Sequence, residues 1–168
     1  MGRKPASTST AESSGFMLIP VYEYGEVVAH TIIDDQDFVL VSEYRWRLNT
    51  HGYAATKSSS LALHRLLMNP GSGKCIDHIN RDKLDNRRGN LRICSHQENQ
   101  RNRPAQKNNT SGFKGVSWHA QTKKWRAGIV LDSKLISLGC FNDKIDAAKA
   151  YNAKAKELFG EFAWLNPV

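Results

Sequence analysis

The segment from Cys75 to Arg103 constrains the fold of this 168-residue chain more than any other, because it carries several structural signals within about thirty residues. Two short apolar stretches, Cys75-Ile76 and residues 91–94, flank a long polar loop. This arrangement predicts two short antiparallel strands. Ser95 and Glu98 have the spacing of a capping box, in which each side chain satisfies a backbone donor at the start of a helix. The segment is therefore predicted to fold as strand, strand and helix.

Polar side chains with catalytic potential accompany each of these elements. Asp77 and His78 follow the first apolar stretch, Asn90 precedes the second, and Asn99 lies in the first turn of the predicted helix. A histidine can take a proton from water near neutral pH. Carboxylate and amide oxygens favour Mg²⁺ or Mn²⁺ over zinc. Together these groups favour metal-assisted hydrolysis of a phosphodiester bond.

This pattern of residues resembles the HNH family of endonucleases, also called ββα-metal nucleases, over about thirty residues. The resemblance implies that His78 activates water and that Asp77 and Asn99 bind one divalent cation, Mg²⁺ or Mn²⁺. It also implies that Asn90 orients the loop that carries His78. The third position of the motif is Asn99 rather than histidine, which makes an H-N-N variant.

Three further residues have roles that the sequence leaves open. His96 is a rival of Asn99 as a metal ligand, because it lies three residues earlier and can share a helix face. Asn86 is a candidate brace for the polar loop. His64, in a segment that commonly precedes this motif, is either a core residue or a DNA contact.

The net charge of +8 is confined to the neighbourhood of the motif. Residues 1–73 contain 6 basic residues (Lys and Arg) and 7 acidic residues (Asp and Glu). Residues 74–126 contain 13 basic and 4 acidic residues, and residues 127–168 contain 5 of each kind. A basic block of this kind predicts a polyanionic partner. The arginines expected to contact phosphates are Arg81, Arg87, Arg88, Arg101 and Arg103.

The three cysteines lack a Cys-x-x-Cys spacing, so neither a disulfide framework nor a structural zinc site is expected. No apolar run is long enough to span a bilayer, and no signal-peptide pattern begins the chain. We therefore expect a cytoplasmic protein with no membrane partner and no small-molecule substrate.

The organisation of the chain is predicted to be α+β, with a disordered tail over residues 1–15 and a nuclease domain over residues 16–103. The polar residues 104–110 are expected to form a linker, and residues 111–168 a second domain. In this domain three strands precede a helix that begins after Asn142 or Asp143 and ends at Gly160. Alternation along the strands places four residues in the core, namely Trp125, Ile129, Leu138 and Phe141.

The C-terminal segments KGVSWHA, KKWRAGIVL, ISLGCF and DAAKAY, with a terminal Leu-Asn, resemble the APETALA2-type DNA-binding domain. The resemblance implies a three-stranded sheet, packed on one helix, that lies in the major groove of DNA. Gly128, Val130 and Ser137 replace residues that contact DNA in the plant proteins, so contacts to phosphates and to DNA shape are expected instead. The residues placed on the outer face, its rim or its turn are Lys114, Ser117, His119, Lys123, Lys124, Arg126 and Ser137.

A nuclease unit and a DNA-reading unit in one chain resemble the HNH homing endonucleases of phages and bacterial mobile elements. The resemblance implies a metal-dependent enzyme that nicks double-stranded DNA inside a bacterial host cell, as a monomer or weak dimer. It also implies 5′-phosphate and 3′-hydroxyl ends. The main alternative is a sequence-specific DNA-binding regulator or a decayed nuclease. A structural RNA-binding protein also suits the charge but leaves Asp77-His78 unexplained.

Overall fold

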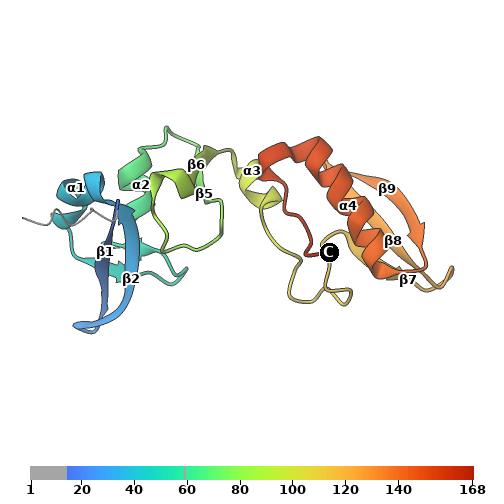
Figure 1. Ribbon diagram of the computed structural model, residues 1–168, viewed down its shortest axis with the longest axis horizontal. Coiled ribbons are helices and arrows are strands. Elements are labelled where there is room, and N and C mark those ends of the chain that lie inside the picture. Colours follow the sequence, from blue (N-terminus) through green and yellow to red (C-terminus); the bar gives the residue numbers. More distant parts are fainter. Residues whose placement is uncertain (1–14, 59) are drawn as a thin grey trace, which may run out of the picture. The chain divides into compact units, whose positions relative to one another are not determined.

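The computed structural model describes residues 15–58 and 60–168 as a mixed α+β fold of small sheets and short helices (Figure 1). The predicted tail, residues 1–15, lies outside the described residues apart from Gly15. Contacts within the chain divide it into two compact units. The first unit comprises the residues up to Gly71 together with His78–Ile93, and the second comprises Ser72–Asp77 and Cys94–Val168.

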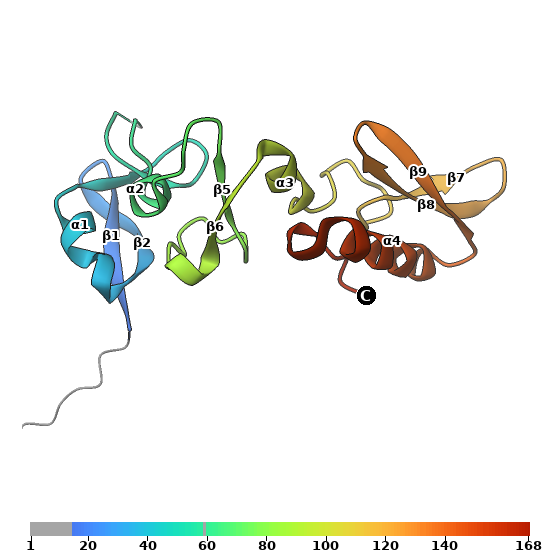
Figure 2. The same cartoon turned by 90° about the horizontal axis from the view of Figure 1, so that it is seen from above.

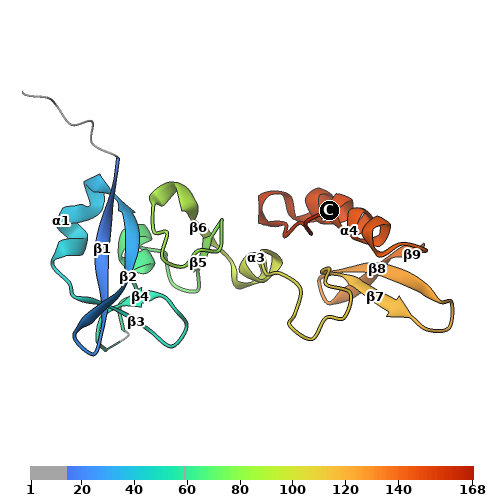
Figure 3. The same cartoon turned by 60° about the horizontal axis from the view of Figure 1, so that its bottom comes forward.

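A four-stranded sheet, in the order β2-β1-β3-β4, is the frame of the first unit (Figure 3). Its strands are β1 (Phe16–Glu23), β2 (Glu26–Asp34), β3 (Trp46–Leu48) and β4 (Ala54–Ala55). β1 and β2 form an antiparallel hairpin, β3 runs parallel to β1, and β4 runs antiparallel to β3. This sheet of short strands agrees with the α+β class predicted from the sequence.

The β1–β2 hairpin is closed by a two-residue turn. Tyr24 and Gly25 have φ angles of 49° and 96°, and the residues on either side of them are paired. Two successive positive φ angles are what the type I′ turn requires, and this turn matches the twist of the strands it joins. Glycine adopts such a conformation without steric cost, which explains its position here.

Short helices cover the sheet of the first unit. They are the 3₁₀ turn η1 (Asp35–Asp37), α1 (Phe38–Ser42) and α2 (Leu63–Met68). Val41 and Trp46 are almost fully buried, and the Trp46 indole N–H donates to the Val41 carbonyl oxygen at 3.0 Å. This bond ties the end of α1 to β3 and satisfies a polar group inside the core.

The motif segment folds as the sequence predicts. β5 (Cys75–His78) and β6 (Leu91–Cys94) form a separate two-stranded sheet, the 3₁₀ turn η2 (Arg88–Asn90) precedes β6, and α3 (His96–Arg101) follows it (Figure 2). The capping box is confirmed, because Ser95 accepts the Glu98 N–H and Glu98 accepts the Ser95 N–H. α3 belongs to the second unit, together with the C-terminal domain.

The C-terminal domain is an antiparallel sheet with one helix against it (Figure 1). Its elements are β7 (Val116–His119), β8 (Lys124–Leu131), β9 (Lys134–Phe141), α4 (Lys144–Phe159) and the 3₁₀ turn η3 (Gly160–Phe162). Asp143 caps α4 by accepting the Ile145 N–H at 2.6 Å. No helix among the described residues is long and apolar enough to cross a membrane.

Small residues let α4 approach the sheet closely. Ala147, Ala148 and Ala155 are fully buried against Val116, Ala127, Ile129 and neighbouring side chains. Of the four predicted core residues, Ile129 is buried, whereas Trp125, Leu138 and Phe141 are partly buried at its margin. Ile145 in the first turn of α4 is 41 % exposed, whereas Ala147 is buried.

Gly115 is the tightest point of this packing. A methyl group there would overlap the Tyr151 ring and the Gly128 carbonyl oxygen, whereas one at Gly112 would meet no atom within 4 Å. Both glycines have positive φ angles, 73° and 80°, so they share the same backbone strain on substitution.

We therefore expect Gly115→Ala to lower the free energy of unfolding by about 2–4 kcal/mol, from overpacking and strain together. Gly112→Ala should cost only about 1 kcal/mol, from strain alone. Urea unfolding of both variants measures the difference. Equal losses would show that the contact with Tyr151 does not constrain the domain.

Candidate active site

The buried end of β5 carries the two charged or titratable residues of the motif. Asp77 is 6 % exposed and His78 is 4 % exposed, although both are polar. Buried polar groups require hydrogen-bond partners, so each of these side chains must be held by its surroundings. Asp77 belongs to the second unit and His78 to the first.

The imidazole of His78 is held by a fixed amide. Its Nε2 lies 3.2 Å from Oδ1 of Asn86, which is 1 % exposed. The Asn86 amide nitrogen donates to Thr31 Oγ1 at 2.7 Å, and the Thr31 hydroxyl donates to the Leu84 carbonyl oxygen at 2.7 Å. The Thr31 oxygen must therefore accept from Asn86, which settles which end of the amide faces His78.

This arrangement selects a tautomer of His78. Since the Asn86 oxygen can only accept, the proton of a neutral His78 ring resides on Nε2. Nδ1 is then the nitrogen with the basic lone pair. Asn86 accordingly positions the ring and defines its basic atom.

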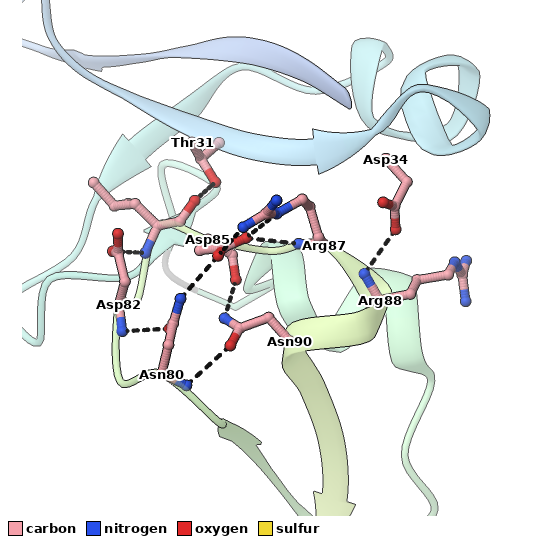
Figure 4. A network of polar contacts seen from close by, with 9 residues as sticks. Thr31, Asp34, Asn80, Asp82, Asp85, Arg87, Arg88 and Asn90 are labelled. Atoms are coloured by element: carbon pink, nitrogen blue, oxygen red, sulfur yellow. Dashed lines mark hydrogen bonds and ion pairs between the residues drawn. The ribbon is translucent and has the colours of Figure 1, made fainter. Parts of the chain in front are cut away.

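The loop after His78 is braced by a second amide, Asn90 (Figure 4). The Asn90 oxygen accepts the backbone N–H of Asn80 at 2.9 Å, and its nitrogen donates to the Asp85 carbonyl oxygen at 2.7 Å. Asn80 in turn donates to the Asp85 carboxylate at 2.8 Å. Asn90 thereby joins both sides of the loop that follows β5.

Arg87 and Arg88, expected to contact phosphates, both have internal carboxylate partners. The Arg87 guanidinium makes a bidentate pair with Asp85 at 2.8 and 2.7 Å, which lowers the pKa of that buried carboxyl group. Arg88 makes a bidentate pair with Asp37, with a shortest distance of 2.8 Å. Asp34 also accepts the Arg88 backbone N–H, at 2.7 Å, and this bond is drawn as a dashed line in Figure 4. Arg87 thus braces the loop internally, whereas Arg88 ties it to β2 and η1. Bidentate pairs of this kind require a specific geometry.

Helix α3 carries Asn99 and its rival His96. Asn99 is half-buried, whereas His96 is exposed and its Nε2 lies 3.2 Å from Nε2 of Gln100. The choice between them as a metal ligand stays a prediction in favour of Asn99.

Asp77 has a partner that the sequence reasoning missed. Nδ2 of Asn102, the residue that caps the C-terminus of α3, lies 3.0 Å from both carboxylate oxygens of Asp77. Asn102 is 7 % exposed, so the contact is buried. The available signal was the spacing, since Asn99 and Asn102 are three residues apart and can share a helix face.

Comparison with known proteins shows which family the segment around Asp77 and His78 resembles. Residues 69–101 match the family model described as HNH endonuclease. The chain is 33 % identical over 136 residues to an uncharacterised HNH endonuclease of Acanthamoeba polyphaga mimivirus, covering 77 % of this chain and 70 % of that protein. The chain belongs to the HNH endonuclease family. This HNH protein is also 33 % identical over 91 residues to Protein 3.8 of Escherichia phage T7, covering 54 % of this chain and 74 % of that protein. No solved structure matches this chain.

Membership of the HNH family makes the protein a nuclease, and a nuclease acts on nucleic acid. The matched segment contains β5, the braced loop, β6 and α3. The buried His78 and Asp77 therefore lie within the part of this HNH chain that defines the family.

Lys114 is not on the outer face of the C-terminal sheet, so its expected placement is wrong. It precedes β7, and its ammonium group donates to the carbonyl oxygens of Arg101 at 2.8 Å and Arg103 at 2.7 Å. Burial lowers its pKa to about 8. The alternation pattern predicted the wrong position for Lys114, because its side chain extends to the end of α3 instead of the sheet face.

The other residues expected on the sheet are exposed or lie at a turn. Ser117 pairs with Arg126 and Gly128 pairs with Ser137, so these side chains share the face away from α4. His119 Nδ1 lies 2.8 Å from Thr122 Oγ1 near the first turn, where Lys123 has a φ of 49°. Val130 and Leu135 are exposed and cross-strand paired on the same face.

His64 contacts His78, the histidine of the HNH motif, through its ring. The His64 and His78 ring centroids are 5.3 Å apart, and Tyr53 lies beside both at 4.9 and 5.7 Å. Burial, and secondarily the proximity of His78, lower the pKa of His64 to about 4. His64 is thus a packing residue of the site, which favours the first of its two expected roles.

The contact with His78 predicts that Asn86→Asp raises the pKa of His78 by about one unit or more, because a carboxylate beside Nε2 stabilises the imidazolium. NMR titration of the His78 ring protons measures this pKa directly. The acid limb of the nuclease pH profile should move to higher pH with it. The control Asn108→Asp adds the same charge in the polar linker, and it should leave the pKa of His78 and the pH profile unchanged. An unaltered His78 titration in Asn86→Asp would refute the contact.

Burial of His64 predicts a loss of stability in acid. Its folded-state pKa of about 4 lies below the unfolded value of 6.5, so the unfolded chain takes up the proton first as the pH falls. Between pH 7 and pH 5 this group should remove about 2 kcal/mol from the free energy of unfolding.

The variant His64→Phe should lose correspondingly less stability over the same pH range. The control is His30→Phe, which replaces an exposed histidine on β2 and should behave as the wild type. Urea unfolding at the two pH values compares them. An equal pH dependence in wild type and His64→Phe would contradict the assigned burial effect.

Proposed function

We propose that this nuclease is a metal-dependent endonuclease that nicks double-stranded DNA, with the C-terminal sheet recognising the target. The observation that carries the proposal is the buried His78, whose Nε2 is fixed by Asn86 and which directly follows Asp77 on β5. A general base and a metal-binding carboxylate are the two groups that phosphodiester hydrolysis needs most.

His78 is proposed as the general base. With the ring proton held on Nε2 by Asn86, Nδ1 can take the proton of the attacking water. The water oxygen attacks phosphorus and the bond to the 3′ oxygen breaks, which leaves a 5′-phosphate and a 3′-hydroxyl. Base catalysis of this kind contributes about 10²–10⁴-fold to the rate.

Asp77 and Asn99 are proposed to hold one divalent cation. Both belong to the second unit, and their donor atoms are a buried carboxylate and an amide oxygen, a donor set suited to Mg²⁺ or Mn²⁺ with water completing the coordination. When bound, the cation stabilises negative charge on the phosphate and on the leaving oxygen. Asn102 remains available to retain the carboxylate through its amide N–H group.

Recognition of DNA is assigned to the basic part of the chain and the outer face of the sheet. The excess of positive charge lies in residues 74–126, which suits a nucleic-acid backbone. Arg126, Ser117 and Ser137 share the face away from α4, as do the side chains that read DNA in the APETALA2-type domains this region resembles. The exposed Val130 and Leu135 offer apolar contact to thymine methyl groups.

The proposed setting is that of a homing endonuclease from a phage or mobile element, acting in the cytoplasm of a bacterial host as a monomer or weak dimer. The relatives are a mimivirus HNH endonuclease and a phage protein, which supports a viral or mobile context. One HNH site acts on one strand, so nicking is the expected product of a monomer.

Incubation with a supercoiled plasmid library in Mg²⁺ or Mn²⁺ tests this function. We expect nicked circles whose ends map to a preferred sequence, no cleavage in EDTA, and a loss of about 10²–10⁴-fold in His78→Ala. The matched control, His30→Ala, removes an exposed histidine of β2 and should cut normally. If the protein retards DNA containing its preferred site but no metal produces cuts, it is a DNA-binding regulator instead.

A further inference from the structure

The metal-binding carboxylate is oriented by one amide at the end of α3. Both oxygens of Asp77 lie 3.0 Å from Nδ2 of Asn102, and both side chains are buried. A hydrogen bond to an ionised carboxylate is stronger than one between neutral groups, and this one fixes the plane of the carboxylate. Groups that hydrogen-bond a ligating carboxylate govern how well it binds its metal.

The backbone around Asn102 is held in turn by a lysine of the C-terminal domain. Lys114 Nζ donates to the carbonyl oxygens of Arg101 at 2.8 Å and Arg103 at 2.7 Å, the two residues that flank Asn102. The Trp164 backbone N–H also donates to the Arg101 carbonyl oxygen, at 3.3 Å. A cation at the C-terminus of a helix is favourable, because the last carbonyl groups have no partner within the helix.

Lys114 is itself fixed by Asn166, which follows η3. Its backbone N–H donates to the Asn166 side-chain oxygen at 2.7 Å, and its carbonyl accepts from the Asn166 amide at 3.1 Å. Asn166 exchanges two further hydrogen bonds with Asn152 of α4, at 2.7 and 2.9 Å. The Arg101 guanidinium also lies over the Phe159 ring, 4.5 Å from its centroid.

A continuous series of contacts thus runs from α4 to Asp77 within the second unit. We propose that Asn102 positions the Asp77 carboxylate for the metal and that Lys114 positions Asn102, so that the C-terminal domain is part of the metal site's support. This inference rests on the proposed metal dependence. It makes Lys114 a positioning residue of the nuclease rather than a DNA contact.

A double-mutant cycle in the full chain tests this. Mn²⁺ affinity is measured without DNA, from the electron paramagnetic resonance signal of free Mn²⁺. Asn102→Ala should weaken binding by about 10–100-fold, as loss of a partner of a metal ligand does. Lys114→Met should weaken it by about 3–30-fold in the wild-type background, and by much less when Asn102 is already Ala.

Two further variants separate positioning from loss of charge or of fold. Lys114→Arg keeps a cationic donor and should restore most of the affinity. Lys149→Met removes an exposed lysine of α4 and should change nothing. If Lys114→Met does not fold, as judged by circular dichroism, Lys114→Gln replaces it in the cycle. Its shorter, uncharged amide cannot reproduce both bonds of the ammonium group, so a loss of Mn²⁺ affinity that depends on Asn102 is still expected.

The proposal is overturned if Lys114→Met weakens Mn²⁺ binding equally with and without Asn102, or no more than Lys149→Met does. Failure of the underlying metal dependence gives a different result, namely a wild-type protein that binds no Mn²⁺. In that case the ¹⁵N resonance of the Asn102 side-chain amide reports the positioning directly. It should move in Lys114→Met and stay in place in Lys149→Met, and an unmoved resonance in Lys114→Met refutes the inference.

Discussion

Burial of polar side chains is the constraint on which both units of this protein depend. Asp77, His78, Asp85, Asn86 and Asn90 are all less than 10 % exposed, in a chain with small hydrophobic cores. An unpartnered buried polar group costs about 1–3 kcal/mol, so the loop of the motif is stable only when every group is paired. Throughout the described residues, no buried side-chain nitrogen or oxygen lacks a hydrogen-bond partner. The hydrogen-bond network that satisfies this constraint also fixes the orientation of the side chains proposed to act in catalysis.

In each unit, the partners of the buried polar groups come from residues of the same unit that are distant in the sequence. In the first unit, β2 supplies Thr31 to orient Asn86 and η1 supplies Asp37 to bind Arg88, each more than fifty residues away along the chain. In the second, Asn166 near the C-terminus holds Lys114, which caps α3. Such networks over-determine the geometry of a small site, and functional groups held in this way need little reorganisation before they react.

The local elements were predictable from sequence because their causes are local. The capping box at Ser95, the strands on either side of the polar loop, and the Asp143 and Gly160 ends of α4 all depend on residues within a few positions. The partners of Arg87 and Arg88 were not predictable, since guanidinium groups suit phosphate and carboxylate equally. Lys114 and Asn102 were missed because their partners are backbone carbonyls and a distant carboxylate, which leave no periodic signal. The sequence placed Asn99 in the helix, but the hydrogen bonds of Asp77 depend on tertiary structure.

Asp77 is proposed here as a metal-binding carboxylate held by Asn102. A crystal structure with Mn²⁺, using the anomalous scattering of the ion, tests this most directly. We expect an anomalous peak about 2.0–2.3 Å from one Asp77 oxygen, with the Asn102 amide still bonded to the carboxylate. A peak remote from Asp77, or a bound ion with Asn102 turned away from the carboxylate, would contradict it.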